Sequence, residues 1–158
     1  MVTPAAHPGP SSVRLPVAIV DELIAHARAG YPNEACGLIL GSAPAAQGGR
    51  PLRFAPTRNA AVSPHRYEID SADLLRLTLE ADERDEAFWA IVHSHVRSPA
   101  RPSPTDIGLA FYPDALYLLV SLADDEADPL TGRPSVRAWR IVDGQVFEVD
   151  LELVDGPA

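Results

Sequence analysis

Two histidines one residue apart, His93 and His95, are the residues of this chain best placed to do chemistry. They follow the run 87–92, which is apolar enough to form a buried strand. Side chains two residues apart on a strand point to the same face, so both imidazoles should project together from the end of this element. With the carboxylate of Asp106 they would leave one position of a tetrahedral zinc ion open, as a catalytic site requires. Together with Glu34, which could transfer protons, these residues predict a zinc hydrolase.

Each of these residues also has a purely structural interpretation. A histidine near a strand end is commonly a hydrogen-bonded structural residue, although two on one face are harder to explain in this way. Ser103, Pro104 and Asp106 resemble a helix N-terminus, as the N-cap, the first helical residue and an acidic third residue. A helix start can also direct a carboxylate at a nearby ion, and spacing alone does not decide between the roles. Glu34 by itself would be an exposed loop carboxylate.

The elements that must position these residues follow mixed helical and extended patterns. Apolar residues recur at helical spacing in 17–29 and 71–84, the second with Asp70 or Ser71 as N-cap, and a short helix should start near Pro104. Strands are expected at 38–40, 52–57, 66–69, 88–95, 116–122, 136–142 and 146–154. The dipeptide Asp143-Gly144 predicts a hairpin between the last two. The pattern predicts one α/β or α+β domain, with a mixed sheet and two main helices.

Composition narrows the class of protein. At 158 residues, with 46% hydrophobic and 22% charged residues, the chain fits one soluble globular domain. The net charge of -9 argues against nucleic acid as a ligand, because contacts to a phosphate backbone need a basic surface. No apolar run approaches the roughly 20 residues of a membrane span, and the start lacks a signal peptide. We expect a cytoplasmic protein with a disordered tail over 1–14, one domain over 15–154 and a C-terminal tail over 155–158.

The chain has a single cysteine, Cys36. An intrachain disulfide is therefore impossible, and a reducing compartment fits. One cysteine cannot build a thiolate zinc site, and it also excludes the Cys-x-x-Cys pattern of zinc deaminases. The small and apolar neighbours of Cys36 favour a buried filler over a nucleophile.

In their order and spacing, the site residues resemble the JAMM (MPN-plus) zinc metalloprotease family. The family motif is a Glu before a Gly-containing strand, then His-x-His, then Asp after ten residues, with Ser three before the Asp. The similarity extends over about 15–154, and segments 32–39, 91–95, 102–106 and 140–144 look especially like small bacterial Mec-type members. Those members remove cysteine from the C-terminus of a ubiquitin-like sulfur-carrier protein. One departure is Val96, where many members have proline directly after the second histidine.

The resemblance implies a curved mixed sheet flanked by helices, of the MPN type that is related to cytidine deaminases. It implies one Zn²⁺ per chain on His93, His95 and Asp106, with Glu34 transferring protons. It also implies that the Ser103 hydroxyl stabilises the oxyanion. Capping and oxyanion binding would compete for one lone pair of this hydroxyl, and we expect the catalytic role to dominate.

The resemblance further implies a substrate. It would be an amide after the Gly-Gly tail of a ubiquitin-like or sulfur-carrier protein, and a homodimer is compatible with the family. Two alternatives within the family are a catalytically silent scaffold and a general deubiquitinase-like isopeptidase. Silent members usually lack the histidine pair or the aspartate. The chain is short for the insertions with which larger members hold ubiquitin.

Overall fold

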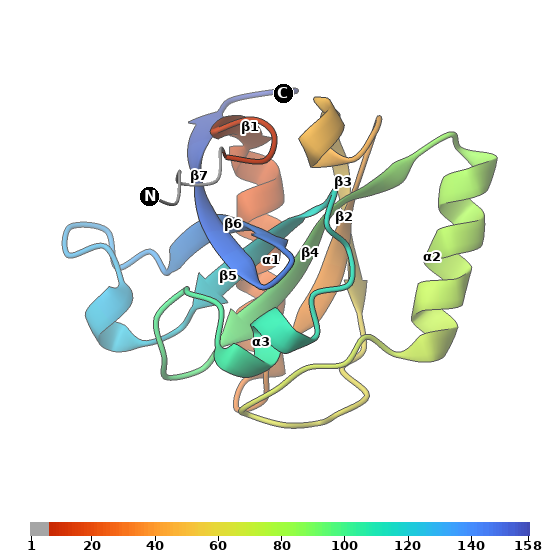
Figure 1. The fold of residues 1–158 in the computed structure, drawn as a ribbon. Coiled ribbons are helices and arrows are strands. Elements are labelled where there is room, and N and C mark those ends of the chain that lie inside the picture. Colours follow the sequence, from red (N-terminus) through yellow and green to blue (C-terminus); the bar gives the residue numbers. More distant parts are fainter. Residues whose placement is uncertain (1–6) are drawn as a thin grey trace, which may run out of the picture.

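A mixed seven-stranded sheet, in the order β1-β7-β6-β5-β4-β2-β3, is the frame of this protein (Figure 1). The computed structural model describes residues 7–158. Neighbouring strands are antiparallel except for the parallel pairs β1–β7 and β4–β5. The sheet is strongly curled, so that its edge strands β1 and β3 contact each other. The strands are β1 (Ser12–Pro16), β2 (Cys36–Gly41), β3 (Pro51–Thr57), β4 (Ala87–His95), β5 (Leu116–Ser121), β6 (Ser135–Val142) and β7 (Gln145–Val154).

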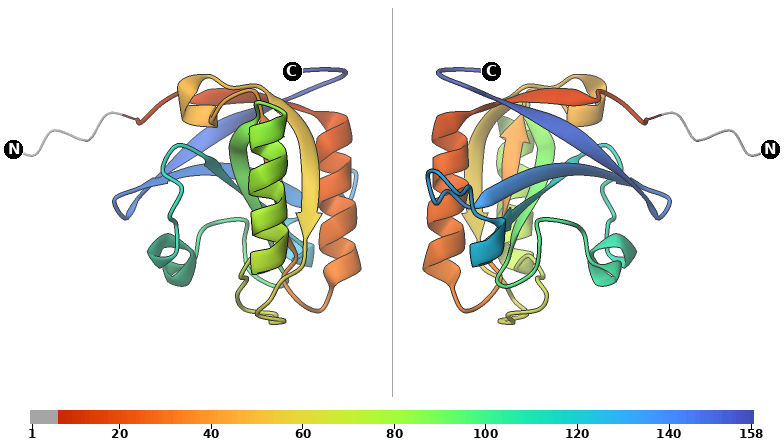
Figure 2. Two further views of the ribbon diagram at one scale, coloured as in Figure 1. Left: turned by 90° about the vertical axis from the view of Figure 1, so that its right-hand side faces the viewer. Right: turned by 90° about the vertical axis from the view of Figure 1, so that its left-hand side faces the viewer.

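Two long helices cover opposite faces of this sheet (Figure 2). They are α1 (Val17–Gly30) and α2 (Ser71–Glu83), and a five-residue helix, α3 (Pro104–Gly108), follows β4. The short 3₁₀ turns η1 (Ala45–Gln47) and η2 (Asp124–Glu126) lie in the connections. The apolar stripe expected on α1 is buried, and Asp70 caps α2 by accepting from two backbone N–H groups, as predicted. The single-domain mixed α/β fold is therefore confirmed.

Strand β4 shows how the sheet separates its two faces. Ala90 and Val92 pack in the core under α1, whereas Ile91 packs in the core under α2. This alternation places His93 and His95 on the α2 face, because they share the parity of Ile91. Both neighbours of β4, β2 and β5, are buried along their whole length. The histidine pair is therefore carried by the most protected strand of the sheet.

The structure corrects two predictions. Residues 66–69 form no strand, since only an isolated bridge joins Asn59 to Ile69, and side-chain hydrogen bonds hold this segment instead of a ladder. The expected tail over 1–14 is wrong at its inner end, because Ser12–Pro16 form β1 in parallel register with β7. That pairing joins distant parts of the chain, so no local pattern reveals it. Residues 1–6 lie outside the described part.

The predicted hairpin is confirmed. Asp143 and Gly144 join β6 to β7 with φ values of 50° and 74°, as a primed two-residue turn requires. Within residues 7–158, no helix combines the length and apolar character needed to cross a membrane.

Gly37 offers a test of how tightly β2 is packed beside the site. A Cβ on this residue would lie 2.7 Å from the carbonyl oxygen of Ala55 on β3. Gly37→Ala should therefore lower the free energy of unfolding by about 1–3 kcal/mol, the usual effect of a substitution that adds atoms to a well-packed core. Gly108→Ala is the matched control, because a Cβ there meets nothing within 4 Å. Chemical denaturation measures both, and equal stability of the two variants would contradict the close packing.

Candidate active site

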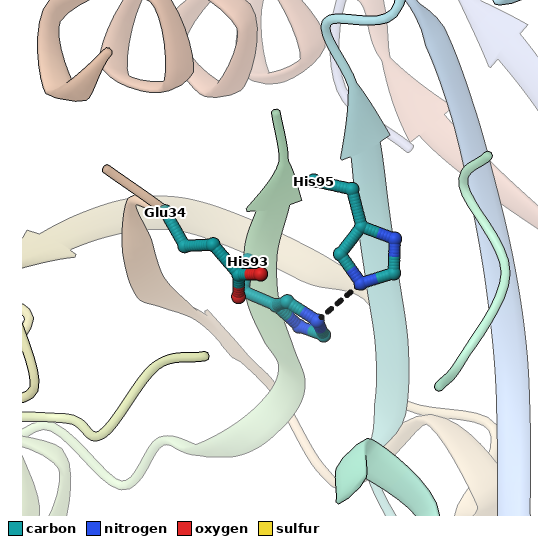
Figure 3. A group of neighbouring side chains, drawn as sticks. All are labelled: Glu34, His93 and His95. Carbon is teal, nitrogen blue, oxygen red and sulfur yellow. Dashed lines mark hydrogen bonds between the residues drawn. The ribbon is translucent and has the colours of Figure 1, made fainter. Parts of the chain in front are cut away.

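Four of the residues singled out by sequence meet at one end of the sheet. His93 and His95 lie at the end of β4, and Asp106 lies in the first turn of α3. Glu34 lies in the connection just before β2, which begins at Cys36. All four side chains are buried. Figure 3 shows Glu34 beside the two imidazoles. Glu34 does not fit the purely structural interpretation as an exposed loop carboxylate, because its exposed fraction is only 4%.

The ligand atoms of these residues converge. The Nε2 atoms of His93 and His95 are 3.3 Å apart, and Oδ2 of Asp106 lies 3.2 Å from the first and 3.1 Å from the second. One carboxylate oxygen of Glu34 lies within 4.8 Å of a ring nitrogen of each histidine. Geometry alone thus offers two carboxylates beside one histidine pair.

The donor set fits a bound cation. Nδ1 of His95 lies 2.7 Å from the carbonyl oxygen of Pro99, which can only accept, so Nδ1 carries the proton. In the neutral ring, Nε2 then presents a lone pair toward the carboxylate of Asp106, which is also an acceptor. Such electron-rich atoms remain this close only with a proton or a cation between them. A hydrogen bond from the far ring nitrogen to a carbonyl is also the usual support of a ligating histidine.

The start of α3 orients Asp106. Its Oδ2 accepts from the backbone N–H of Ser103 at 2.9 Å, and Oγ of Ser103 accepts from the backbone N–H of Asp106 at 3.1 Å. This is the capping box expected from sequence. Burial would raise the pKa of Asp106, but the contacts of its carboxylate with His93 and His95, together with the N–H of Ser103, hold this pKa well below its usual range. Asp106 is therefore ionised and directed at the histidines.

The same geometry corrects the expected conflict at Ser103. Capping uses a lone pair of the hydroxyl oxygen, because the hydroxyl accepts from Asp106. An oxyanion needs a donor, and the O–H proton of Ser103 donates to no group in the described part of the chain, so it is available for this role. The two roles are therefore compatible.

Glu34 is held in a different environment. Its Oε1 is buried without a hydrogen-bond partner among the described residues. Burial raises the pKa of Glu34 to about 7, although nearby His95 acts in the opposite direction. Its backbone is fixed, since the N–H of Glu34 donates to the carbonyl of Ser63 at 2.8 Å. A carboxylate with this pKa can both take up and release a proton near neutral pH.

A cleft of about 410 Å³ opens at these residues. Glu34, His95 and Ser103 all line it, so a ligand in the cleft reaches the buried group. The remaining lining residues are Tyr31, Pro32, Pro64, His65, Val96, Arg97 and Ser98.

Sequence reasoning missed three residues that support the site. Oγ of Ser94 accepts from the N–H of Ala35 at 2.8 Å and so ties the Glu34 segment to β4. The Asn59 amide donates to the carbonyl of Glu34 at 3.0 Å. The ring of Tyr67 stacks on His93. These contacts link segments far apart in the chain. The only local signal in the sequence is the alternation of side chains along a strand, which directs Ser94 away from the two histidines beside it.

Cys36 takes no part in this group. Its thiol is fully buried and lies 3.3 Å from Oγ1 of Thr57. Burial raises the pKa of the thiol to about 11, so the thiolate is scarce near neutral pH. The expectation of a small buried residue is confirmed.

Comparison with known proteins gives a consistent result. Residues 16–142 match a family model described as prokaryotic homologs of the JAB domain. The CysO-cysteine peptidase of Mycobacterium tuberculosis is 40% identical over 138 residues, which are 87% of this chain and 88% of that protein. The desampylase of Haloferax volcanii is 31% identical over 107 residues, 64% of this chain and 74% of that protein.

Solved structures agree with the fold. A protein from Desulfitobacterium hafniense superposes with a TM-score of 0.74 at 31% identity, covering 90% of this chain and 93% of its own. A JAB1/MPN domain protein from Archaeoglobus fulgidus shares the fold, with a TM-score of 0.52 at 19% identity over 90% of this chain and all of its own. This chain therefore belongs to the prokaryotic JAB-domain members of the JAMM (MPN-plus) family, and it is a hydrolase of peptide or isopeptide bonds.

Proposed function

We propose that this hydrolase binds one zinc ion through His93, His95 and Asp106. We further propose that it cleaves the amide bond after the C-terminal Gly-Gly tail of a ubiquitin-like or sulfur-carrier protein. One observation carries the proposal: two imidazole nitrogens and an ionised carboxylate converge beside a cleft lined by Glu34, whose buried Oε1 has no hydrogen-bond partner among the described residues.

Asp106, rather than Glu34, is the proposed carboxylate ligand. Its Oδ2 is in contact with both Nε2 atoms, and its low pKa keeps it charged. Glu34 has the raised pKa that suits a proton carrier. When bound, zinc would act as a Lewis acid that polarises the scissile carbonyl and makes water more acidic.

In the proposed mechanism, Glu34 accepts the proton of the attacking water at Oε1 and then delivers it to the leaving amine. Both transfers occur inside the cleft, where the held backbone of Glu34 keeps the carboxylate in one place. The O–H of Ser103 donates to the carbonyl oxygen as negative charge develops there. Ser103 lines the same cleft, and the cap at Asp106 fixes its position.

Two relatives support the proposed substrate class. One is named a CysO-cysteine peptidase and the other a desampylase. The CysO-cysteine peptidase is similar to this chain over a larger part of its length than the desampylase is. This favours a cysteine leaving group over the side chain of lysine. The presence of all the site residues favours an active enzyme over a silent scaffold.

The expected cytoplasmic location and the homodimer stay proposals. A reducing compartment agrees with a single buried thiol.

Removal of any one ligand should release the metal. His93→Ala, His95→Ala and Asp106→Ala should each lose most of the zinc, because two protein ligands bind the ion much more weakly than three. His65→Ala is the control, since this residue lines the cleft outside the converging group. Elemental analysis of purified proteins measures occupancy. Full occupancy in two of the three variants would contradict the ligand assignment.

Glu34→Gln should retain zinc and the fold but lose about 100-fold or more in kcat, because the amide cannot accept the proton. Glu68→Gln, on an exposed residue of the neighbouring segment, should keep wild-type turnover. The measurement is kcat together with zinc content. Turnover near wild type in the Glu34 variant would exclude it from the proton transfer.

The proposed substrate can be tested side by side with its alternative. A carrier ending in Gly-Gly and extended by one cysteine should be cleaved faster than a lysine-linked ubiquitin dimer. Deleting the two glycines should abolish cleavage, because the extended tail must enter the cleft. If the dimer reacts faster by roughly tenfold or more, the protein is a general isopeptidase instead.

Cys36 should not act as a nucleophile. Alkylation at pH 8 should be slow in the folded protein and fast in denaturant, because the buried thiol is protonated. Cys36→Ser should leave hydrolysis largely intact. Mass spectrometry follows both reactions, and a covalent acyl adduct on Cys36 during turnover would overturn the water-based mechanism.

A further inference from the structure

We infer that Tyr67 is a positioning residue whose ring holds the imidazole of His93 in its ligating orientation. The inference rests on the proposed metal site. It concerns an aromatic stack that replaces a hydrogen bond at one of the two histidines.

The two imidazoles are supported differently. Nδ1 of His95 is fixed by the carbonyl of Pro99 at 2.7 Å. Nδ1 of His93 is buried and has no hydrogen-bond partner among residues 7–158. Ligating histidines almost always use the second ring nitrogen as an anchor. Without this anchor, another contact must set the orientation of the His93 ring, because the terminal torsion of histidine is intrinsically broad.

That contact is the ring of Tyr67. Its centroid lies 4.1 Å from the centroid of His93, and the two planes are inclined by 20°. Rotation of the imidazole about its terminal torsion would drive a ring edge into this face. The stack therefore restricts the ring to the plane in which Nε2 meets His95 and Asp106.

Tyr67 can act in this way because its own backbone is fixed on both sides. The Asn59 amide donates to the carbonyl of Arg66 at 3.1 Å and accepts from the N–H of Glu68 at 2.9 Å. The same amide donates to the carbonyl of Glu34. One side chain thus couples the position of the aromatic ring to that of the proposed proton carrier.

The ring, not the hydroxyl, carries this role. The Tyr67 hydroxyl makes no hydrogen bond in the part of the chain that the structure describes, whereas the aromatic face is in direct contact with His93. Tyr67→Phe is therefore a matched control that keeps the stack, and Tyr67→Leu removes it with an apolar side chain.

The test measures zinc affinity by competition with a chromophoric chelator at fixed pH. Tyr67→Leu should bind zinc about 10-fold or more weakly, the usual cost of losing a support behind a metal ligand. Tyr67→Phe should stay within about twofold of wild type, since the stack persists. Leu77→Ala removes a buried side chain of α2 and should lower Tm without changing zinc affinity.

A second readout needs no variant. In the metal-free wild type, NMR should find the His93 ring protons shifted upfield by the tyrosine ring current. The absence of this shift would overturn the inference even if Tyr67→Leu failed to fold. Two results with the variants would also overturn it. One is a zinc affinity of Tyr67→Leu equal to that of the wild type. The other is a loss of zinc affinity in Tyr67→Phe and Leu77→Ala as large as the loss in Tyr67→Leu. If the wild type itself binds no zinc, the proposed function fails, and this inference fails with it.

Discussion

The site depends on one electrostatic constraint: electron-rich atoms are held in contact in a buried place. Nε2 of His95 and Oδ2 of Asp106 lie 3.1 Å apart while Nδ1 of the same ring is committed to a carbonyl. In a low-dielectric interior this arrangement is costly unless positive charge lies between the atoms. The strand, the helix cap and the neighbouring segment all serve to keep the ligand atoms there.

The environment separates the two carboxylates into different roles. Asp106 accepts from a backbone N–H and contacts both histidines, so its pKa lies below the usual range. Glu34 has an oxygen with no partner among residues 7–158, and its burial raises its pKa to about 7. Pairs of acids whose pKa values are pushed apart are typical of sites in which one stays charged and the other moves protons. The division follows from where each carboxylate sits, not from its residue type.

Local patterns in the sequence were enough for part of this site. Strand parity predicted that His93 and His95 share a face, and the Ser103-to-Asp106 spacing predicted the capping box. Both depend on neighbouring residues only. The burial of Glu34 could not be predicted in this way, because it follows from the antiparallel pairing of β2 with β4, in which Cys36 lies opposite His93. The 66–69 segment was wrongly expected to be a strand, because Asn59 holds it through hydrogen bonds that no periodicity reveals.

The most direct test of the account is a zinc-soaked crystal measured at the zinc absorption edge. The account predicts one anomalous peak per chain, bonded to Nε2 of His93, Nε2 of His95 and a carboxylate oxygen of Asp106, with Glu34 nearby but not coordinating. A peak ligated by Glu34 in place of Asp106, or no peak at this group under saturating zinc, would contradict it.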